Sequence, residues 1–109
     1  MRRMTMKEDT SYYSLDVYDN DDNDGIQGET FEKYVRIDYI FVAKRDRGRG
    51  KGRELLRKAI AEAKRHHLPI FIIASQLEPS TDLEQLVDFY EREGFSVHSS
   101  AGSAILMEY

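Results

Sequence analysis

A short basic segment, Arg47-Gly48-Arg49-Gly50-Lys51-Gly52, has the residue types of an anion-binding turn. It follows an apolar segment and precedes one with helical periodicity, so it should form the turn into a helix. The first N–H groups of a helix lack partners within the helix, and the positive end of the helix dipole favours anions. Glycines let a phosphate approach these groups because they carry no side chain. The segment therefore predicts a phosphate site.

Two common phosphate-binding patterns do not fit this segment. The P-loop requires Ser or Thr after its Gly-Lys pair, whereas Lys51 is followed by Gly52. The dinucleotide pattern Gly-x-Gly-x-x-Gly can start at Gly48 but requires a glycine where Arg53 stands. A segment rich in arginine and glycine could also contact the phosphates of nucleic acid. The residues alone therefore predict a phosphate site without naming the molecule that carries the phosphate.

A second candidate lies toward the C-terminus, in the segment Phe89-Tyr90-Glu91-Arg92-Glu93-Gly94-Phe95. A phenol at the end of an apolar helix face can donate a proton in catalysis. Tyr90 also continues the apolar helical face formed by Leu83 and Val87, which is where a structural core tyrosine would lie. On these residues alone, both interpretations of Tyr90 are open.

These candidates require a scaffold in which strands and helices alternate. The patterns predict strands at Tyr12–Tyr18, Thr30–Val42, Ile70–Ala74, Phe95–Ser99 and Ala104–Tyr109, and helices at about Gly50–His66 and from a cap at Ser80 or Thr81 to Gly94. One face of the long strand is expected to carry Phe31, Val35, Ile37, Tyr39 and Phe41. Residues 1–10 are expected to be flexible. This order favours a single domain over residues 1–109, with helices packed on a sheet.

The sequence resembles the GNAT superfamily of N-acetyltransferases at three places. The phosphate turn of that family reads Arg/Gln-x-x-Gly-x-Gly/Ala, and Arg47, Gly50 and Gly52 match it. The apolar segment Ile40-Phe41-Val42 ends five residues before the turn, like the central strand of the family. The segment Phe89 to Phe95 looks like the family motif Phe-Tyr-Glu-x-x-Gly-Phe. The three matches occur in the family's order along the chain.

The resemblance covers about Val35 to Tyr109 and implies an α+β fold. This fold is a compact GNAT-like mixed sheet with two main helices, in which the N-terminal helices are reduced or absent. The resemblance also implies an acetyl-CoA-dependent N-acetyltransferase that uses no metal. Backbone groups of the turn would hold the CoA pyrophosphate, and those of the strand would pair with the pantetheine arm. The implied cofactor-binding residues are Ile40, Phe41, Val42, Arg47, Gly48, Arg49, Gly50, Lys51, Gly52 and Arg53.

The resemblance also assigns catalytic roles for a direct attack of the amine on acetyl-CoA. Tyr90 would be the general acid that protonates the leaving thiolate of CoA. The amine must first lose a proton, and family members use a carboxylate or a water chain for this. Asp38 is the first candidate because it lies on the central strand, four residues before Val42. Glu32 is a second candidate carboxylate, and water is the third possibility.

The short segment before the long strand suggests an open acceptor site, which suits a protein lysine better than a small molecule that must be enclosed. The acidic segment Asp19–Asp24 could attract a basic protein surface. Within the family, the chain is similar to a phage-encoded anti-CRISPR acetyltransferase that modifies a lysine of a CRISPR nuclease. The shared features are Ile37-Asp38, Leu68-Pro69 and Asp88-Phe89-Tyr90. A second copy of the chain, in a homodimer, could instead supply the missing wall.

The composition of the chain excludes several other classes of protein and of binding site. The chain has 109 residues and no cysteine, which excludes disulfides and thiolate metal sites. It carries no apolar run of membrane-spanning length, so a cytoplasmic protein without a membrane partner is expected. Residues Asn20–Gly25 imitate the start of a calcium loop, but Phe31 stands where the bidentate Glu belongs. Two alternatives to the enzyme stay open: a basic nucleic-acid-binding module, and a CoA-binding protein without activity.

Overall fold

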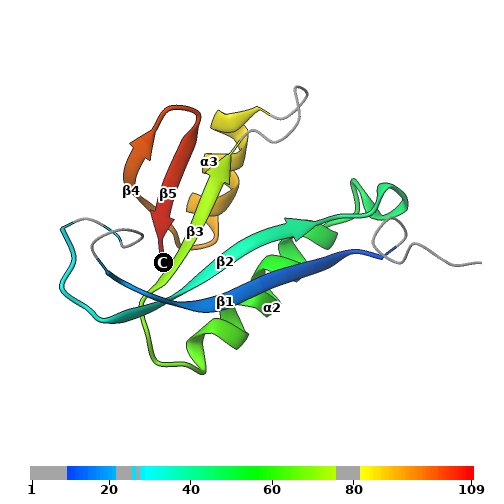
Figure 1. Ribbon diagram of the computed structural model, residues 1–109. Helices are drawn as coiled ribbons and strands as arrows, with labels where there is room; N and C mark the ends of the chain where they lie inside the picture. The colour runs from blue at the N-terminus through cyan, green and yellow to red at the C-terminus, as the bar shows by residue number, and fades with distance from the viewer. Residues whose placement is uncertain (1–9, 22–25, 27, 76–81) are drawn as a thin grey trace, which may run out of the picture.

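The computed structural model describes residues 10–21, 26, 28–75 and 82–109, and these residues form one mixed sheet with two α-helices on one face (Figure 1). The strands are β1 (Tyr12–Asp19), β2 (Lys33–Phe41), β3 (Ile70–Ser75), β4 (Ser96–Ala101) and β5 (Ala104–Glu108). The helices are α2 (Lys51–Lys64) and α3 (Leu83–Arg92), and a short 3-10 helix, η1 (Lys44–Asp46), precedes the basic turn. The predicted α+β architecture is therefore confirmed.

The strands lie in the order β1-β2-β3-β5-β4, and only the β2–β3 pair is parallel. Helix α2 provides the crossover between these two strands, as a parallel connection requires. Pairing between them is confined to Val35–Ile37 on β2 and Ile70–Ile72 on β3. Beyond these residues the two strands diverge, as Figure 1 shows. We call this divergence the splay; among the described residues, it leaves the end of β2 without a paired strand on its β3 side.

A β-bulge interrupts the pairing of β1 with β2 at the start of the splay. Ser14 pairs with Tyr39 and Leu15 pairs with Ile37, so Asp38 has no residue opposite it. A bulge changes the side to which the following side chains point. Val35, Ile37 and Ile40 accordingly belong to the core beneath the helices. Tyr39 and Phe41 instead contact the ring of Tyr12.

The expectation that the residues from Phe31 to Phe41 share one face is therefore wrong. The alternation changes at Asp38, and Phe31 packs against Phe71 on the face away from the helices. Strand β2 also begins later than predicted, at Lys33 rather than Thr30. A bulge depends on the pairing with another strand, so the pattern within this segment alone could not indicate it.

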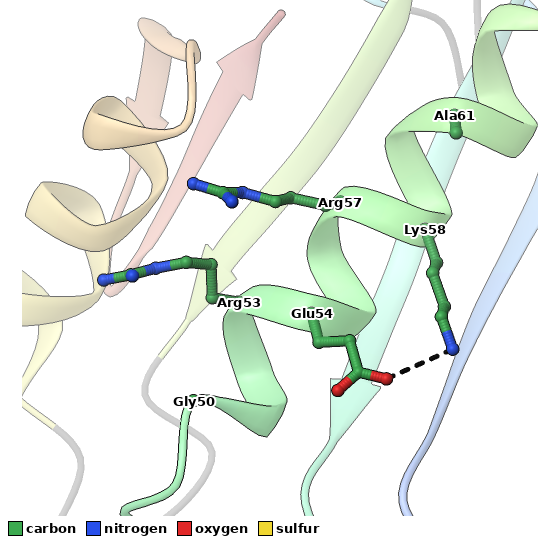
Figure 2. Close-up of a pocket in the computed structure, with 6 residues that line it drawn as sticks. All are labelled: Gly50, Arg53, Glu54, Arg57, Lys58 and Ala61. Atoms are coloured by element: carbon green, nitrogen blue, oxygen red, sulfur yellow. Dashed lines mark ion pairs between the residues drawn. The ribbon is translucent and has the colours of Figure 1, made fainter.

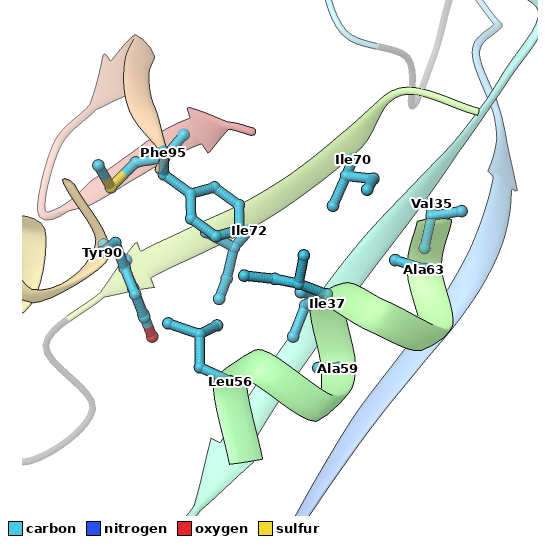
Figure 3. Packing of buried hydrophobic residues seen from close by; sticks show 12 residues of the cluster. Val35, Ile37, Leu56, Ala59, Ala63, Ile70, Ile72, Tyr90 and Phe95 are labelled. Carbon is cyan, nitrogen blue, oxygen red and sulfur yellow. The ribbon is translucent and has the colours of Figure 1, made fainter. Parts of the chain in front are cut away.

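Helix α2 packs an apolar stripe against β1, β2 and β3 because its small and branched residues recur at helical spacing. The buried residues of this stripe are Leu55, Leu56, Ala59, Ile60 and Ala63. Figure 3 shows Leu56, Ala59 and Ala63 facing the branched side chains of β2 and β3. Helix α3 adds Tyr90 to the same cluster. The two helices are therefore held on one face of the sheet, over the region where it splays.

The ends of α3 agree only in part with the sequence patterns. Its N-cap is Asp82, whose carboxylate accepts from the N–H groups of Glu84 and Gln85 at 3.0 and 3.4 Å. The predicted caps, at positions 80 and 81, lie outside the described residues. Gly94 follows the helix with a φ of 110°, as predicted for a helix-ending glycine.

The opposite face of the sheet has a smaller aromatic core. Tyr34 and Phe71 lie edge to face with ring centroids 5.6 Å apart, and Ile26 joins them from the segment before β2. Phe31, Tyr18 and Leu106 pack around this group. No described helix is long and apolar enough to cross a membrane.

Candidate functional site

The basic turn has the unpaired N–H groups that an anion site requires. Gly48 and Gly50 have φ angles of 77° and 79°, a conformation that side-chain-bearing residues rarely adopt. Glu54 makes the first backbone hydrogen bond of α2, donating to the Gly50 carbonyl at 3.1 Å. No carbonyl in the described part of the chain accepts from the N–H groups of residues 48 to 53. The turn therefore presents a row of free donors at the positive end of a helix.

Gly52 lies where the turn meets the rest of the fold. A Cβ atom at this position would lie 3.6 Å from Val42 and 4.0 Å from Phe89, which is ordinary van der Waals contact. The first turn of α2 is therefore packed between the end of β2 and helix α3. An alanine fits here, which agrees with the Gly/Ala alternative at the last position of the motif.

A groove of about 490 Å³ runs from the turn along the exposed side of α2. Figure 2 shows Arg53 and Arg57 projecting from the helix to one side of this groove, with Glu54 and Lys58 paired on the other side. Both arginines contact Glu93, at 3.7 and 2.8 Å, and the side chain of that glutamate is only 9% exposed. The groove therefore begins at the free N–H groups and is lined by cations that other residues hold in place.

The splay supplies a free strand edge beside the turn. On its β3 side, β2 has no strand partner after Ile37 in the described part of the chain, so its backbone groups there can pair with an extended ligand. One predicted contact is already occupied, because the Arg47 side chain donates to the Val42 carbonyl at 3.2 Å. The segment Asp38–Phe41 is thus more available to a ligand than Val42. Ile40 and Phe41 lie on this edge, and their contact with a cofactor stays a prediction.

Tyr90 extends from α3 into the core, toward the turn of α2 that carries Leu56 (Figure 3). Only 6% of the residue is exposed, and this burial raises the pKa of Tyr90 to about 12. No described residue forms a hydrogen bond with its hydroxyl. The described part of the chain has no fully buried side-chain oxygen without a partner, so the hydroxyl retains contact with solvent. Tyr90 is therefore a protonated phenol whose hydroxyl is free to bind a ligand.

Asp38 lies at the bulge, on the sheet face away from α2. Its Oδ1 accepts from the Tyr18 hydroxyl at 2.7 Å and from Arg36 Nε at 2.8 Å. The Arg36 guanidinium lies 4.0 Å from the centre of the Tyr18 ring, so the three side chains support one another. Burial and the bond to Asp38 raise the pKa of Tyr18, which stays a donor. No described residue donates to the second carboxylate oxygen of Asp38.

The structure separates the two carboxylates that were candidates for proton removal. Glu32 precedes β2, at the end of the strand away from the splay, roughly 20 Å along an extended strand from Asp38. Only Asp38 therefore lies at the splay. Its partners Arg36 and Tyr18 were not identified from the sequence. Arg36 could have been found from the sequence, because residues two apart in a strand lie on the same face. Tyr18 could not, because its contact with Asp38 depends on the register of the β1–β2 pair.

The predicted residues thus fall into two groups that meet at the splay. The cofactor group, from Ile40 to Arg53, and Tyr90 lie at the ends of β2, α2 and α3. Asp38 follows Ile37 directly, so the two side chains point to opposite faces of the sheet. A molecule lying in the splay would have Tyr90 on one side and Asp38 on the other.

Comparisons with known proteins agree with this geometry. The family described as Acetyltransferase (GNAT) domain matches residues 12–97. The Bacillus subtilis (strain 168) protein YjbC, named as a candidate acetyltransferase, is 36% identical over 73 residues. That match covers 66% of this chain and 36% of YjbC, so the chain spans about a third of the length of this curated relative.

Solved structures show the same fold. The anti-CRISPR protein AcrVA5 is 26% identical with a TM-score of 0.58, and the match covers 70% of this chain and 78% of AcrVA5. The PaiA N-acetyltransferase of Thermoplasma acidophilum, solved in complex with coenzyme A, is 18% identical with a TM-score of 0.52, covering 69% of this chain and 45% of that protein. This second likeness concerns the fold alone. With the family match extending from β1 into β4, the chain belongs to the GNAT acetyltransferase family.

Proposed function

We propose that this protein transfers the acetyl group of acetyl-CoA to a primary amine, most simply the side chain of a protein lysine. The observation that carries the proposal is the splay between β2 and β3, which opens beside the unpaired N–H groups of residues 48 to 53. An extended ligand with a diphosphate at one end matches both features together. A diphosphate alone would need only the turn.

The parts of CoA correspond to separate parts of this site. The pyrophosphate would accept hydrogen bonds from the N–H groups of the turn. The pantetheine arm, which contains two amides, would pair with the free edge of Asp38–Phe41 as an added strand. The 3′-phosphate of the nucleotide would lie in the groove along α2, near Arg53 and Lys58. This arrangement leaves the thioester in the splay, close to Tyr90.

In the transfer step, the amine nitrogen attacks the thioester carbonyl, the new C–N bond forms, and the C–S bond breaks with its electron pair going to sulfur. A thiol has a pKa of about 8.5, so complete proton transfer from a phenol of pKa about 12 would be uphill by about 5 kcal/mol. Tyr90 is therefore assigned as a hydrogen-bond donor to the departing sulfur. This refines the role of general acid, because the thiolate can later take its proton from solvent.

On the other face of the sheet, Asp38 would receive the amine. Its free oxygen would accept from the ammonium of the acceptor and then take a proton from it, directly or through water. Arg36 and Tyr18 fix the direction of the carboxylate through its first oxygen. The attacking nitrogen would thus approach from Asp38 while sulfur leaves toward Tyr90.

A protein lysine is the favoured acceptor because Asp38, whose side chain is 19% exposed, lies next to Tyr39, a residue that is 43% exposed. A long, flexible side chain can reach the carboxylate across such an open surface. The chain is also similar to the anti-CRISPR protein AcrVA5, and on that likeness we include an anti-CRISPR role in the proposal. If the protein is a homodimer, the second copy would lie beside this face and form a wall of the acceptor site.

Two glycine substitutions test the CoA site. Gly50→Ala places a side chain on a residue with φ near 79°, so the turn must change conformation, and we expect the Kd for CoA to rise at least tenfold in calorimetric titration. Gly52→Ala is the matched control, because its Cβ meets only ordinary contacts and the Kd should change less than threefold. Equal Kd values for both variants and the original chain would place CoA elsewhere.

Tyr90→Phe tests the donor to sulfur. Removing a hydrogen bond to a charged group costs about 1.5–3 kcal/mol, so kcat for a lysine peptide should fall roughly 10- to 150-fold. The Kd for CoA and the thermal midpoint should stay the same, because the hydroxyl has no partner among the described residues. A lower affinity for CoA with unchanged kcat would mean that Tyr90 has a structural role.

The pH profile tests the same assignment independently. The acceptor amine has a pKa of about 10.4, so kcat/KM should rise as pH increases and more amine is neutral. The pKa of Tyr90 is about 12, so its phenol keeps its proton up to about pH 11 and should cause no alkaline decline below that. An alkaline decline near pH 9 that disappears in Tyr90→Phe would contradict this account.

Asp38→Asn tests the acceptor side. The variant loses the charge that receives the ammonium, so kcat/KM for the peptide should fall at least tenfold while the Kd for CoA is unchanged. Glu32→Gln removes a carboxylate at the distant end of β2 and should leave both values unchanged. If Asp38→Asn also leaves kcat/KM unchanged, the assignment is wrong. The amine would then lose its proton to water, and Asp38 would only support Arg36 and Tyr18.

A further inference from the structure

Three metal-ligating side chains converge on the sheet face away from α2, outside the proposed transfer site. They are Glu29 from the segment before β2, His98 from β4 and Glu108 from β5. Their candidate ligand atoms all lie within 4.8 Å of one another, although Glu29 is distant in sequence from His98 and Glu108. We propose that these side chains bind a divalent transition-metal ion, with Zn²⁺ the best match. The sequence alone left His98 without a role and predicted no metal.

The backbone directs His98 toward this group of side chains. Val97 pairs with Met107 and Ser99 pairs with Leu106, so His98 is the extra residue of a bulge on β4. Bulges turn a side chain away from the regular alternation and are frequent next to functional sites. The His98 ring lies edge to face with Phe71, at 5.7 Å between centroids. Phe71 pairs across the ladder with Glu108, which places both side chains on one face.

The imidazole is held in a suitable orientation for a metal ligand. Its side chain is 14% exposed, its Nδ1 lies 3.2 Å from the Ser99 hydroxyl, and its Nε2 lies 2.9 Å from Glu29. Ligating histidines usually bind a second group through the other ring nitrogen, which fixes the ring and its tautomer. With Nδ1 donating to Ser99, the Nε2 lone pair would point toward the two carboxylates.

The charges in this group favour a cation. Two carboxylates lie close together, and such like charges repel each other unless a cation or a proton lies between them. The Glu29 carboxylate is bonded to His98, whereas the Glu108 carboxylate forms no hydrogen bond or ion pair with any described residue. Imidazole nitrogen and carboxylate oxygen are both ligand types that Zn²⁺ accepts, and three protein ligands would leave a position for water.

A metal at this position would join elements that are distant in sequence. It would connect the segment before β2 to the β4–β5 hairpin, which carries the C-terminal strand of the sheet. A small domain without cysteine has few other means of cross-linking distant segments. Because an ion that binds only the folded state stabilises it by mass action, the expected consequence is a metal-dependent thermal midpoint.

The test uses the full chain without a polyhistidine tag, titrated with zinc chloride in a buffer that does not chelate metals. We expect saturable binding of a single ion and, at saturating zinc, a rise of about 5 °C in the thermal midpoint. His98→Gln and Glu108→Gln should each weaken binding at least tenfold. The matched control is His66→Gln, which removes an exposed histidine at the end of α2 and should leave binding unchanged.

Three results would overturn the proposal. The first is the absence of saturable binding to millimolar zinc, and the second is binding that survives both His98→Gln and Glu108→Gln. The third is a loss of binding in His66→Gln alone, which would locate the ion at the helix end. Each variant is also titrated with CoA, since unchanged CoA affinity shows that the chain is folded and separates this site from the transfer site.

Discussion

The end of pairing between β2 and β3 is the constraint on which the rest of the site depends. The parallel ladder stops at Ile37 and Ile72. Beyond these residues the two strands separate, and β2 leads to α2 while β3 leads to α3. The edge that this opens would be costly if it stayed buried and unpaired. A ligand that paired with the edge would satisfy it, and we therefore propose that the splay and the donor-rich turn at residues 48–53 act as one site.

The bulge at Asp38 gives this site its two sides. Without it, the side chains of β2 would alternate regularly and Ile40 would not face the helices. With it, Ile37 and Ile40 hold the core under α2, while Asp38 is left on the open face beside Arg36 and Tyr18. The donor and acceptor of the proposed transfer can therefore reach the same point from opposite faces of a thin sheet.

Local patterns predicted the parts of the fold that local physics controls. The glycines of the turn, the apolar stripe of α2 and the helix-ending Gly94 each follow from neighbours within a few residues. The two bulges, the switch of face after Ile37 and the meeting of Glu29 with His98 and Glu108 depend on pairing between strands. Such register is set by contacts between segments distant in sequence, so no short window contains it.

The most direct test of the central claim is amide hydrogen exchange, residue by residue, with and without CoA. If CoA lies in the splay, exchange should slow at the amides of Asp38–Phe41 that face β3 and at those of residues 48–53. The amides of β1, which already pair with the other edge of β2, should change little. Protection restricted to the turn, with β2 unchanged, would contradict the account, because it would describe a phosphate site without an added strand.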